Sequence, residues 1–262
     1  MEKTQNQIKE LTLTLKRRLS ARKEFQEQSR LRRNYERKFR RQLNLYFKNF
    51  YDEYANNYEN GFTYENLLRD EQNKLFQLFA QHYQTVIRAF GTRMLEMLRK
   101  DEERFESIYR DYLKENGGAK IVGIVETTRR YIEKIIALNL DENLGIPLIA
   151  KEIRRLDKSS FTKYRSATIA RTETHNAASY ANQKIVESMA IPNMQKQWMT
   201  TQDDRSRDIH LAVNGTRVAL DEDFTVGGLP MAYPGDPRGG AKNVINCRCV
   251  LLYVTPDDDL SN

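Results

Sequence analysis

The chain has 262 residues, of which 39% are hydrophobic and 30% are charged, and its formal net charge is +7. This apolar share is low for a globular protein and indicates long exposed helices rather than one thick core. No apolar run approaches the roughly 18–20 residues of a membrane span, and the N-terminal MEKTQNQIKE lacks the apolar segment of a secretory signal. We therefore expect a protein made in a reducing cytoplasm, with no membrane partner.

Residues 1–60 predict one long basic helix, because helix-forming residues dominate and no glycine or proline occurs between Gln5 and Tyr58. Between Lys16 and Arg41 there are 12 Lys and Arg against three Glu, a local balance of +9. Such a segment suits a polyanion such as double-stranded DNA or an acidic protein face, or it is a solvated helix face that keeps the chain soluble. The residues that we expect to make such contacts are Arg32, Arg33, Arg40 and Arg41.

The apolar residues of this first helix form two groups. One is a stripe at helical spacing, made of Ile8, Leu11, Leu15 and Leu19. The other is an aromatic group, which could stack on bases or fill a helix–helix interface, and its helical spacing favours the interface. Its members are Phe39, Tyr46, Phe47, Phe50, Tyr51 and Tyr54.

Residues 61–158 predict a helical bundle region. Gly61 ends the first helix, and Thr63 is a suitable N-cap for the next one, which Gly91 can divide. Pro147 can open a short helix, because its missing N–H and fixed φ suit the first helical turn. The helices expected here cover about 64–114, 119–139 and 147–156.

Residues 159–262 predict a compact module with an acidic tail. A long helix capped by Ser159 or Ser160 should come first, and its alanine-rich middle lets another element approach closely. Alternation and β-branched runs then predict two strands, with a turn at Asn214-Gly215 and a long loop between them. The expected elements are a helix at 161–189, a strand at 195–200, a short helix at 205–212, a loop at 213–245 and a strand at 250–254. The fold class is mostly α: an extended helical N-terminal region plus a small α+β C-terminal module with a short antiparallel sheet.

Three residues of this module have metal-ligating chemistry: His210, Cys247 and Cys249, with Asp203 near the histidine in sequence. A disulfide across one intervening residue would be strained, whereas zinc prefers ligands of these types. We expect His210 and the two thiols to meet in space, because the glycine-rich loop between them is costly to order without an anchor at its ends. The anchor is either a structural zinc ion or a packed thiol–imidazole cluster with no cofactor.

Five pieces of the C-terminal region share their order and spacing with a known family. They are Ala170-Arg171-Thr172-Glu173, Lys196-x-Trp198, Asp203-Asp204-Arg205-Ser206-Arg207-x-x-His210 with Asn214-Gly215, Pro234-Gly235-Asp236-Pro237, and Asn246-Cys247-Arg248-Cys249. Through these pieces residues 165–254 resemble the C-terminal domain of the phage Mu F-like minor head proteins, also called the phage head morphogenesis family. The sequence departs from some relatives, which have Cys-x-x-Cys where this chain has Arg207-Asp208-Ile209-His210.

The resemblance implies a virion protein present in few copies, in the head interior or at the portal vertex, which acts in head assembly and in DNA packaging or ejection. Its partners would be the portal protein, the major capsid protein or scaffold, and double-stranded DNA without sequence preference. The basic first helix would then lie against DNA or the portal. Polar residues that would stabilise the module, partly as an ion-pair lattice with Asp203, are Arg171, Glu173, Arg205, Arg207 and Asn246.

Two enzymatic alternatives stay open. A metal-dependent nuclease would use His210, Asn214, the aspartates and the cysteines, whereas an ADP-ribosyltransferase-like effector would use Arg171 and Glu173. Against both, the sequence shows no second histidine or carboxylate pair at a spacing that supplies a general base and a metal together. We therefore expect no catalytic residues, and we expect His82 and His175 to be packing residues of helices.

Overall fold

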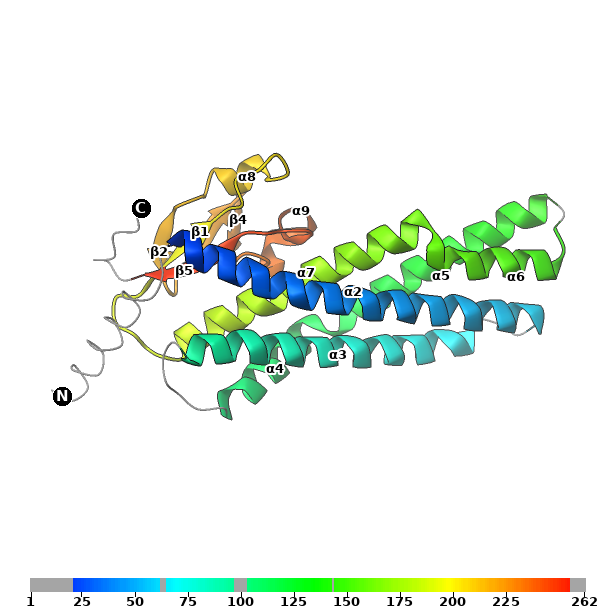
Figure 1. The fold of residues 1–262 in the computed structure, drawn as a ribbon, viewed down its shortest axis with the longest axis horizontal. Helices are drawn as coiled ribbons and strands as arrows, with labels where there is room; N and C mark the ends of the chain where they lie inside the picture. The colour runs from blue at the N-terminus through cyan, green and yellow to red at the C-terminus, as the bar shows by residue number, and fades with distance from the viewer. Residues whose placement is uncertain (1–20, 62–64, 97–102, 143, 255–262) are drawn as a thin grey trace. The chain divides into compact units, whose positions relative to one another are not determined.

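The computed structural model describes residues 21–61, 65–142 except 97–102, and 144–254 (Figure 1). The fold is mostly α with small antiparallel sheets near the C-terminus, as predicted. The apolar stripe of Ile8 to Leu19, the Thr63 cap and the acidic tail lie outside the described residues.

The chain forms two compact units, which differ from the three contiguous segments predicted from the sequence. Unit 1 takes its described residues from Met1–Tyr35, Thr85–Tyr109 and Arg171–Asn262, and unit 2 consists of Glu36–Gln84 and Arg110–Ala170. The division is not contiguous because four long helices each contribute one stretch to either unit. These helices are α2 (Ala21–Glu59), α3 (Glu65–Glu96), α4 (Glu103–Asn116) and α7 (Ser160–Glu187).

The aromatic residues of α2 fill a helix–helix interface within unit 2, as their spacing indicated. Phe39 is fully buried, meets Phe79 of α3 edge to face at 5.2 Å between ring centroids and stacks on His82 at 3.7 Å. The hydroxyl of Tyr51 is 2.9 Å from Thr162 Oγ1 of α7. Ser159 caps α7 by accepting a hydrogen bond from Thr162 N at 3.1 Å.

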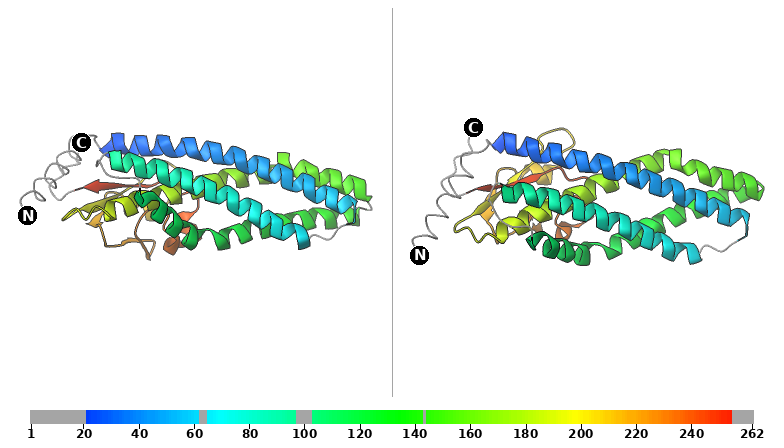
Figure 2. Two further views of the ribbon diagram at one scale, coloured as in Figure 1. Left: turned by 90° about the horizontal axis from the view of Figure 1, so that it is seen from below. Right: turned by 60° about the horizontal axis from the view of Figure 1, so that its bottom comes forward.

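The predicted helix at 64–114 is two helices, α3 and α4, and Gly91 does not divide it. Gly91 lies inside α3, where an added Cβ would come within 2.0 Å of Phe105 Cε1 of α4. The glycine therefore lets an aromatic ring of α4 approach the backbone of α3. In unit 2, α5 (Gly118–Asp141) and α6 (Ile146–Arg154) follow, and Pro147 lies in the first turn of α6; the two helices lie side by side in Figures 1 and 2. The short 3-10 helix η1 (Arg155–Lys158) connects α6 to α7.

The sheet of unit 1 has β1 (Gln195–Met199) in the centre, with β2 (Arg217–Ala219) and β5 (Val250–Val254) antiparallel on either side. β5 is therefore an edge strand of this sheet. The expected strands at 195–200 and 250–254 are confirmed. The turn at Asn214-Gly215 exists, but it connects the short helix α8 (Asp208–Leu211) to β2, because the preceding residues form a helix and not a strand.

The segment 213–245, expected to be a loop, contains regular structure. A hairpin of β3 (Phe224–Val226) and β4 (Leu229–Met231) turns at Gly227-Gly228, where both φ angles are positive, at +58° and +82°. The 3-10 helix η2 (Pro237–Gly239) and the short helix α9 (Gly240–Val244) follow. Across the part of the chain that the structure describes, no helix is both long and apolar enough to span a membrane.

Candidate functional site

His210, Cys247 and Cys249 meet inside unit 1, as predicted, and we call them the thiol–imidazole cluster. Nδ1 of His210 lies 3.8 Å from Cys247 Sγ and 3.4 Å from Cys249 Sγ. The exposed fractions of the three residues are 2%, 1% and 2%. The ligand atoms of the three side chains all lie within 4.8 Å of one another, close enough to hold a metal ion. Among the described residues no other group of three His, Cys, Asp or Glu side chains meets this condition.

Thr200, which the sequence reasoning missed, positions the histidine. Its hydroxyl donates a hydrogen bond to the backbone carbonyl of His210 at 2.8 Å and lies 3.6 Å from Cys249 Sγ. Its own N–H donates to Asn214 Oδ1 at 2.8 Å. The amide oxygen of Asn214 therefore connects the end of β1 to the turn after α8, which is a structural use of a residue that the nuclease alternative assigns to its site.

The pKa values of the two thiols shift in opposite directions. A hydrogen bond from Cys247, together with His210, holds the pKa of Cys249 well below its ordinary value. The same sulfur–sulfur contact and burial raise the pKa of Cys247 well above its ordinary value. The two thiols therefore titrate as a coupled pair and not as independent groups.

Gln28 and Arg32 of α2 bind backbone carbonyls at and just before β5, and we call this pair the carbonyl clamp. Arg32 Nη1 donates to Cys249 O at 3.3 Å, Arg32 Nη2 donates to Arg248 O at 3.0 Å, and Gln28 Nε2 donates to Leu251 O at 3.2 Å. Four residues of a helix rise about 6 Å and two residues of a strand about 6.7 Å. Residues one turn apart on α2 can therefore each donate to one of two alternate carbonyls, those of Cys249 and Leu251, along this edge of the sheet.

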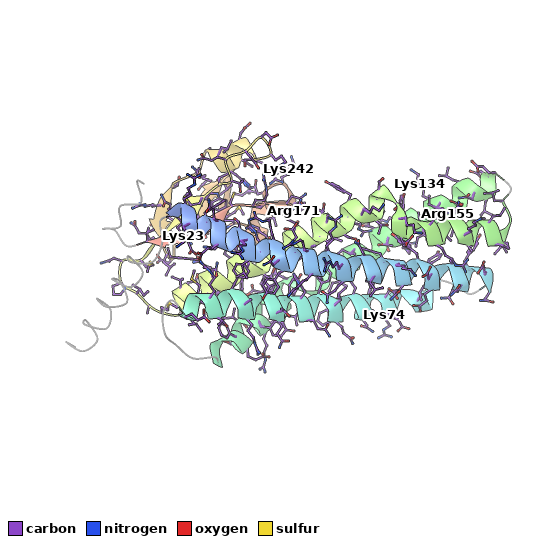
Figure 3. All side chains as sticks on the ribbon, in the orientation of Figure 1. Lys23, Lys74, Lys134, Arg155, Arg171 and Lys242 are labelled. Carbon is purple, nitrogen blue, oxygen red and sulfur yellow. The ribbon has the colours of Figure 1, made fainter. Side chains whose placement is uncertain are left out.

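The carbonyl clamp corrects the prediction that Arg32 contacts DNA. Arg32 is only 7% exposed, and Nη1 also donates to Nδ1 of His175 at 2.6 Å. Because a guanidinium only donates, Nδ1 of His175 is the acceptor and the ring proton is on Nε2. Burial and the neighbouring Arg32 charge keep the pKa of His175 well below its ordinary value. Arg33, Arg40 and Arg41 are exposed, and so is Lys23 near the beginning of α2 (Figure 3).

Asp203 is not part of the thiol–imidazole cluster, because its two carboxylate oxygens pair with Arg248 at 2.5 and 2.6 Å. This pairing holds the pKa of Asp203 well below its usual range. Arg205 reaches the same carboxylate only at 3.5 Å and is 76% exposed. The expected single ion-pair lattice is therefore a local pair whose main cation, Arg248, lies between the two cysteines.

Arg171, Arg207 and Asn246, which the sequence also predicted to stabilise the module, have uncharged hydrogen-bond partners. Arg207 Nη2 donates to Ile245 O at 2.6 Å, and Arg171 Nη1 donates to Asn246 Oδ1 at 2.9 Å. Asn246 has a positive φ of 59°, and its N–H donates to Thr172 Oγ1 at 3.1 Å. Glu173 is 7% exposed on the same helix, α7. The start of the Asn246-Cys247-Arg248-Cys249 segment is thus attached to α7, and the residue before it, Ile245, is bound by Arg207 at the N-terminus of α8.

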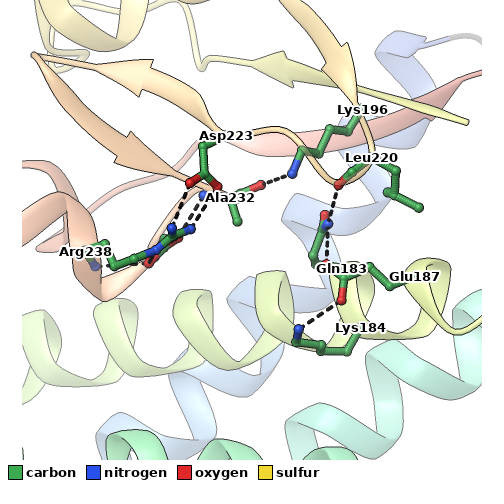
Figure 4. A network of polar contacts seen from close by, with 9 residues as sticks. Gln183, Lys184, Glu187, Lys196, Leu220, Asp223, Ala232 and Arg238 are labelled. Atoms are coloured by element: carbon green, nitrogen blue, oxygen red, sulfur yellow. Dashed lines mark hydrogen bonds and ion pairs between the residues drawn. The ribbon is translucent and has the colours of Figure 1, made fainter.

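A second polar network holds the loop Pro234–Pro237, and Figure 4 shows most of it. Asp236 accepts from Ala232 N at 2.8 Å and from Arg238 Nη2 at 2.7 Å, and Arg238 also pairs with Asp223. Lys196, fully buried on β1, donates to Ala232 O at 2.9 Å. Burial lowers the pKa of this lysine. The lysine of β1 and the aspartate of the loop therefore fix the same short stretch of backbone.

A small recess of about 10 Å³ lies beside the thiol–imidazole cluster, and we call it the arginine recess. Arg205, Arg207 and Arg248 line it together with His210 and Cys249. A volume of this size is what about one water molecule requires. The recess is therefore a polar opening on the cluster, with room for a single ligand atom.

Residues 131–252 match the family model described as Phage Mu protein F like protein. The chain carries a phage Mu F-like domain. Its matched residues include the thiol–imidazole cluster, the arginine recess and the loop network, whereas both residues of the carbonyl clamp precede them. The Mu F-like domain is thus completed in this structure by side chains of α2, which the family match does not cover.

Three curated proteins are similar to parts of this chain. Minor head protein GP7 of Bacillus phage SPP1 is 34% identical over 126 residues, which is 47% of this chain and 40% of GP7. NAD(+)–arginine ADP-ribosyltransferase EFV of Enterococcus faecalis is 27% identical over 206 residues, 71% of this chain and 42% of EFV. YqbB of Bacillus subtilis is 26% identical over 138 residues, 52% of this chain and 45% of YqbB. The chain thus spans less than half of each relative's length, and no solved structure matches it.

Proposed function

We propose that this chain is a minor head protein of a tailed phage or a prophage-derived particle, located in the head interior or at the portal vertex. The observation that carries the proposal is the Mu F-like match over residues 131–252, joined by the 34% identity to the SPP1 minor head protein. The residues in the matched region support a structural role. Their polar groups fix backbone carbonyls and turns, which is how a domain keeps a rigid surface for assembly.

Contact with the portal protein, with the major capsid protein or scaffold, and with packaged DNA belongs to the same proposal. The exposed arginines of α2 support the contact with DNA, because phosphate binding needs accessible cations and no particular base sequence. In unit 1 these residues include Arg30 and Arg33, and in unit 2 they include Arg40 and Arg41. The proposed role is in head assembly and in the packaging or ejection of DNA.

Quantitative mass spectrometry of purified heads tests this role. Heads from a wild-type infection should contain the chain at a small, fixed ratio to the major capsid protein, and heads assembled without the portal protein should lack it. Equal amounts in both kinds of head would contradict portal association but keep the virion role. Absence from all purified heads, with the chain remaining in the soluble lysate, would contradict the proposal as a whole.

The second candidate is an ADP-ribosyltransferase-like effector, and the alignment with EFV over 71% of this chain is the observation that favours it. The alignment covers only 42% of EFV, so the relative's named activity is not assigned to the shared part. The metal-dependent nuclease has less support, because Asp203 is neutralised by Arg248 and the Asn214 side chain holds Thr200 N. We therefore propose that the chain acts without catalysis.

A further inference from the structure

The spacing of the thiol–imidazole cluster is that of a zinc site. In tetrahedral zinc with Zn–S of about 2.3 Å and Zn–N of about 2.05 Å, sulfur and nitrogen lie about 3.6 Å apart. The two distances from His210 Nδ1, 3.4 and 3.8 Å, fall on either side of this value. The two sulfur–nitrogen distances therefore need shifts of only a few tenths of an ångström, and all three ligand atoms lie within 4.8 Å of one another.

The surroundings of the cluster keep these atoms in place independently of any ion. Thr200 holds the carbonyl of His210, and Arg32 holds the carbonyls of Arg248 and Cys249. Charge also favours zinc, because one Zn²⁺ and two thiolates sum to zero, so that loading a site buried to this degree adds no net charge to the interior. Soft thiolates with imidazole are moreover the ligand set that zinc prefers.

Three protein ligands leave one of the four zinc positions open. Asp203 does not take this position, since both of its oxygens pair with Arg248. The arginine recess instead reaches His210 and Cys249 and has room for about one ligand atom. Three arginines line the recess and one of them, Arg248, is paired bidentately, so an oxyanion is favoured there electrostatically.

We propose that His210, Cys247 and Cys249 bind one zinc ion whose fourth position opens into the arginine recess and takes an oxygen of a carboxylate or a phosphate. This site is independent of the minor head role, and either can fail without the other. When zinc binds, the two S–H bonds are replaced by Zn–S bonds and the two thiol protons leave to solvent. The anion oxygen then forms a coordination bond to zinc in place of a water molecule, which returns to solvent. No redox change is involved.

Cobalt titration of the metal-free full-length protein tests the metal site, since Co²⁺ reports its own geometry by absorption. We expect about one equivalent to bind, with the intense visible bands of tetrahedral cobalt and a sulfur-to-cobalt charge-transfer band, and Zn²⁺ to displace it. A weak octahedral spectrum, or no bound metal after desalting, would overturn the proposal.

Matched variants assign the ligands. Cys247→Ser should remove the charge-transfer band or reduce its intensity by about half, because one of the two thiolates is lost. Asp203→Asn is the control, and it should retain one equivalent and the tetrahedral spectrum, since Asp203 binds Arg248 and not the ion. Loss of metal in Asp203→Asn would contradict the assignment of an open fourth position. If Cys247→Ser does not fold, the titration of the wild-type protein still decides the question.

Anion titration of the cobalt-loaded protein tests the fourth position. Acetate and inorganic phosphate are added separately at constant ionic strength, with perchlorate as the control salt. A saturable shift of the visible bands with acetate alone indicates a carboxylate ligand, and a shift with phosphate alone indicates a phosphate ligand. In the Arg205→Gln, Arg207→Gln double variant the anion affinity should fall about tenfold with the metal retained. A spectrum that neither anion changes would overturn the open position.

Discussion

Arg32 and Arg33 are neighbours in the chain and occupy opposite environments. Arg32 is 7% exposed and donates to two carbonyls and to His175, whereas the side chain of Arg33 is exposed. Removing one partner of a buried guanidinium interaction leaves the other partner buried without a hydrogen bond. The resulting loss of stability is larger than the stability that an exposed charge contributes. The two arginines therefore form a matched pair for measuring what the carbonyl clamp contributes to stability.

We expect Arg32→Met to lower the free energy of unfolding by about 2–4 kcal/mol, because it leaves two carbonyls and the His175 nitrogen without their donor. Arg33→Met should change the same quantity by less than about 0.5 kcal/mol. Urea unfolding followed by circular dichroism measures both. Equal effects of the two substitutions would show that the carbonyl clamp adds nothing to stability.

His82 gives the stability a pH dependence. Burial lowers its pKa from 6.5 to about 3, so the folded protein keeps it neutral where the unfolded chain is already protonated. Above pH 6.5 the group contributes no slope. Below that pH the unfolded chain binds a proton that the folded protein does not, and the free energy of unfolding falls by up to about 1.4 kcal/mol per pH unit.

Urea titrations at pH 7, 6, 5 and 4 on the wild-type protein and on His82→Phe measure this contribution. The variant keeps a ring against Phe39 and should lose part of the slope between pH 6 and 4. Other buried groups, including His175, titrate in both proteins and cancel in the difference. Parallel pH profiles would mean that His82 is solvated or protonated in the folded state.

The helical periodicity of the sequence indicates that Arg32 is buried and Arg33 exposed, although a count of charges does not. Gln28, Arg32, Phe39 and Leu43 are spaced by four, seven and four residues, so they share the buried face of α2. Grouping arginines by charge alone placed Arg32 with the exposed ones. Thr200 could not be found in this way, because its role depends on a contact with a residue on another element, α8.

At the scale of elements, the loop Pro234–Pro237 depends on one backbone conformation. Gly235 has a φ of +92°, and an added Cβ there would come within 2.4 Å of Asn176 Oδ1 on α7. Gly215, in the turn before β2, has a similar φ of +81° but no heavy atom within 4 Å of that position. The two glycines separate the cost of the backbone angle from the cost of close packing.

Gly215→Ala should therefore destabilise the protein by about 1 kcal/mol, the cost of a side chain in the left-handed region. Gly235→Ala should cost about 3 kcal/mol or more, since the loop must also move away from α7. Differential scanning calorimetry of the two variants compares them directly. A Gly235→Ala loss no larger than that of Gly215→Ala would indicate that the loop moves away from α7 at no cost.

The exposed arginines of α2 predict binding to duplex DNA that weakens steeply with salt. Replacing Arg33, Arg40 and Arg41 with Gln should reduce the slope of log affinity against log salt by about two to three if each contacts a phosphate. Fluorescence anisotropy with two unrelated duplexes measures the slope and its independence of sequence. The control is Arg130→Gln on α5, an arginine that is 74% exposed and outside α2. A slope that the triple variant leaves unchanged assigns these charges to solubility or to a protein partner.

Helices and the two longer strands of the module follow from periodicity and from Gly and Pro positions, because these signals are local. The hairpin of β3 and β4 is less visible, since each strand has three residues and its Gly-Gly turn lies in a glycine-rich stretch. The break between α3 and α4 was misplaced for a different reason. Gly91 serves a contact with Phe105, a residue 14 positions later, and no local pattern distinguishes such a glycine from a helix end.

At the scale of the whole molecule, we expect the purified chain to transfer no ADP-ribose from NAD⁺ to arginine and to cleave no DNA with Mg²⁺, Mn²⁺ or Zn²⁺. For DNA cleavage, the physical reason is that the described group able to hold a metal ion, the thiol–imidazole cluster, contains no carboxylate to act as a general base. Labelled NAD⁺ with agmatine as acceptor, and supercoiled plasmid, are the assays. Activity that Glu173→Gln abolishes would favour the effector, and cleavage that His210→Ala abolishes would favour the nuclease.

The two units could not be derived from the sequence, because compactness depends on contacts between distant parts of the chain. Changes in composition suggested contiguous segments, whereas unit 1 combines Thr85–Tyr109 and the Mu F-like C-terminal region with the first stretch of α2. The recognisable motifs all lie between Ala170 and Cys249. The α2 residues that complete the domain belong to no such motif, and only the structure pairs them with β5.

The carbonyl clamp also determines when unit 1 can finish folding during translation. Gln28 is 223 residues away from Leu251, and Arg32 is 217 residues away from Cys249. α2 emerges from the ribosome early, and its donors Gln28 and Arg32 then have no carbonyl partners until β5 has been synthesised. Contacts over such sequence separations form slowly and leave exposed surface in the meantime. Unit 2, made of Glu36–Gln84 and Arg110–Ala170, is synthesised completely before β5, so the nascent chain has a stretch of synthesis in which unit 2 can be folded and unit 1 cannot.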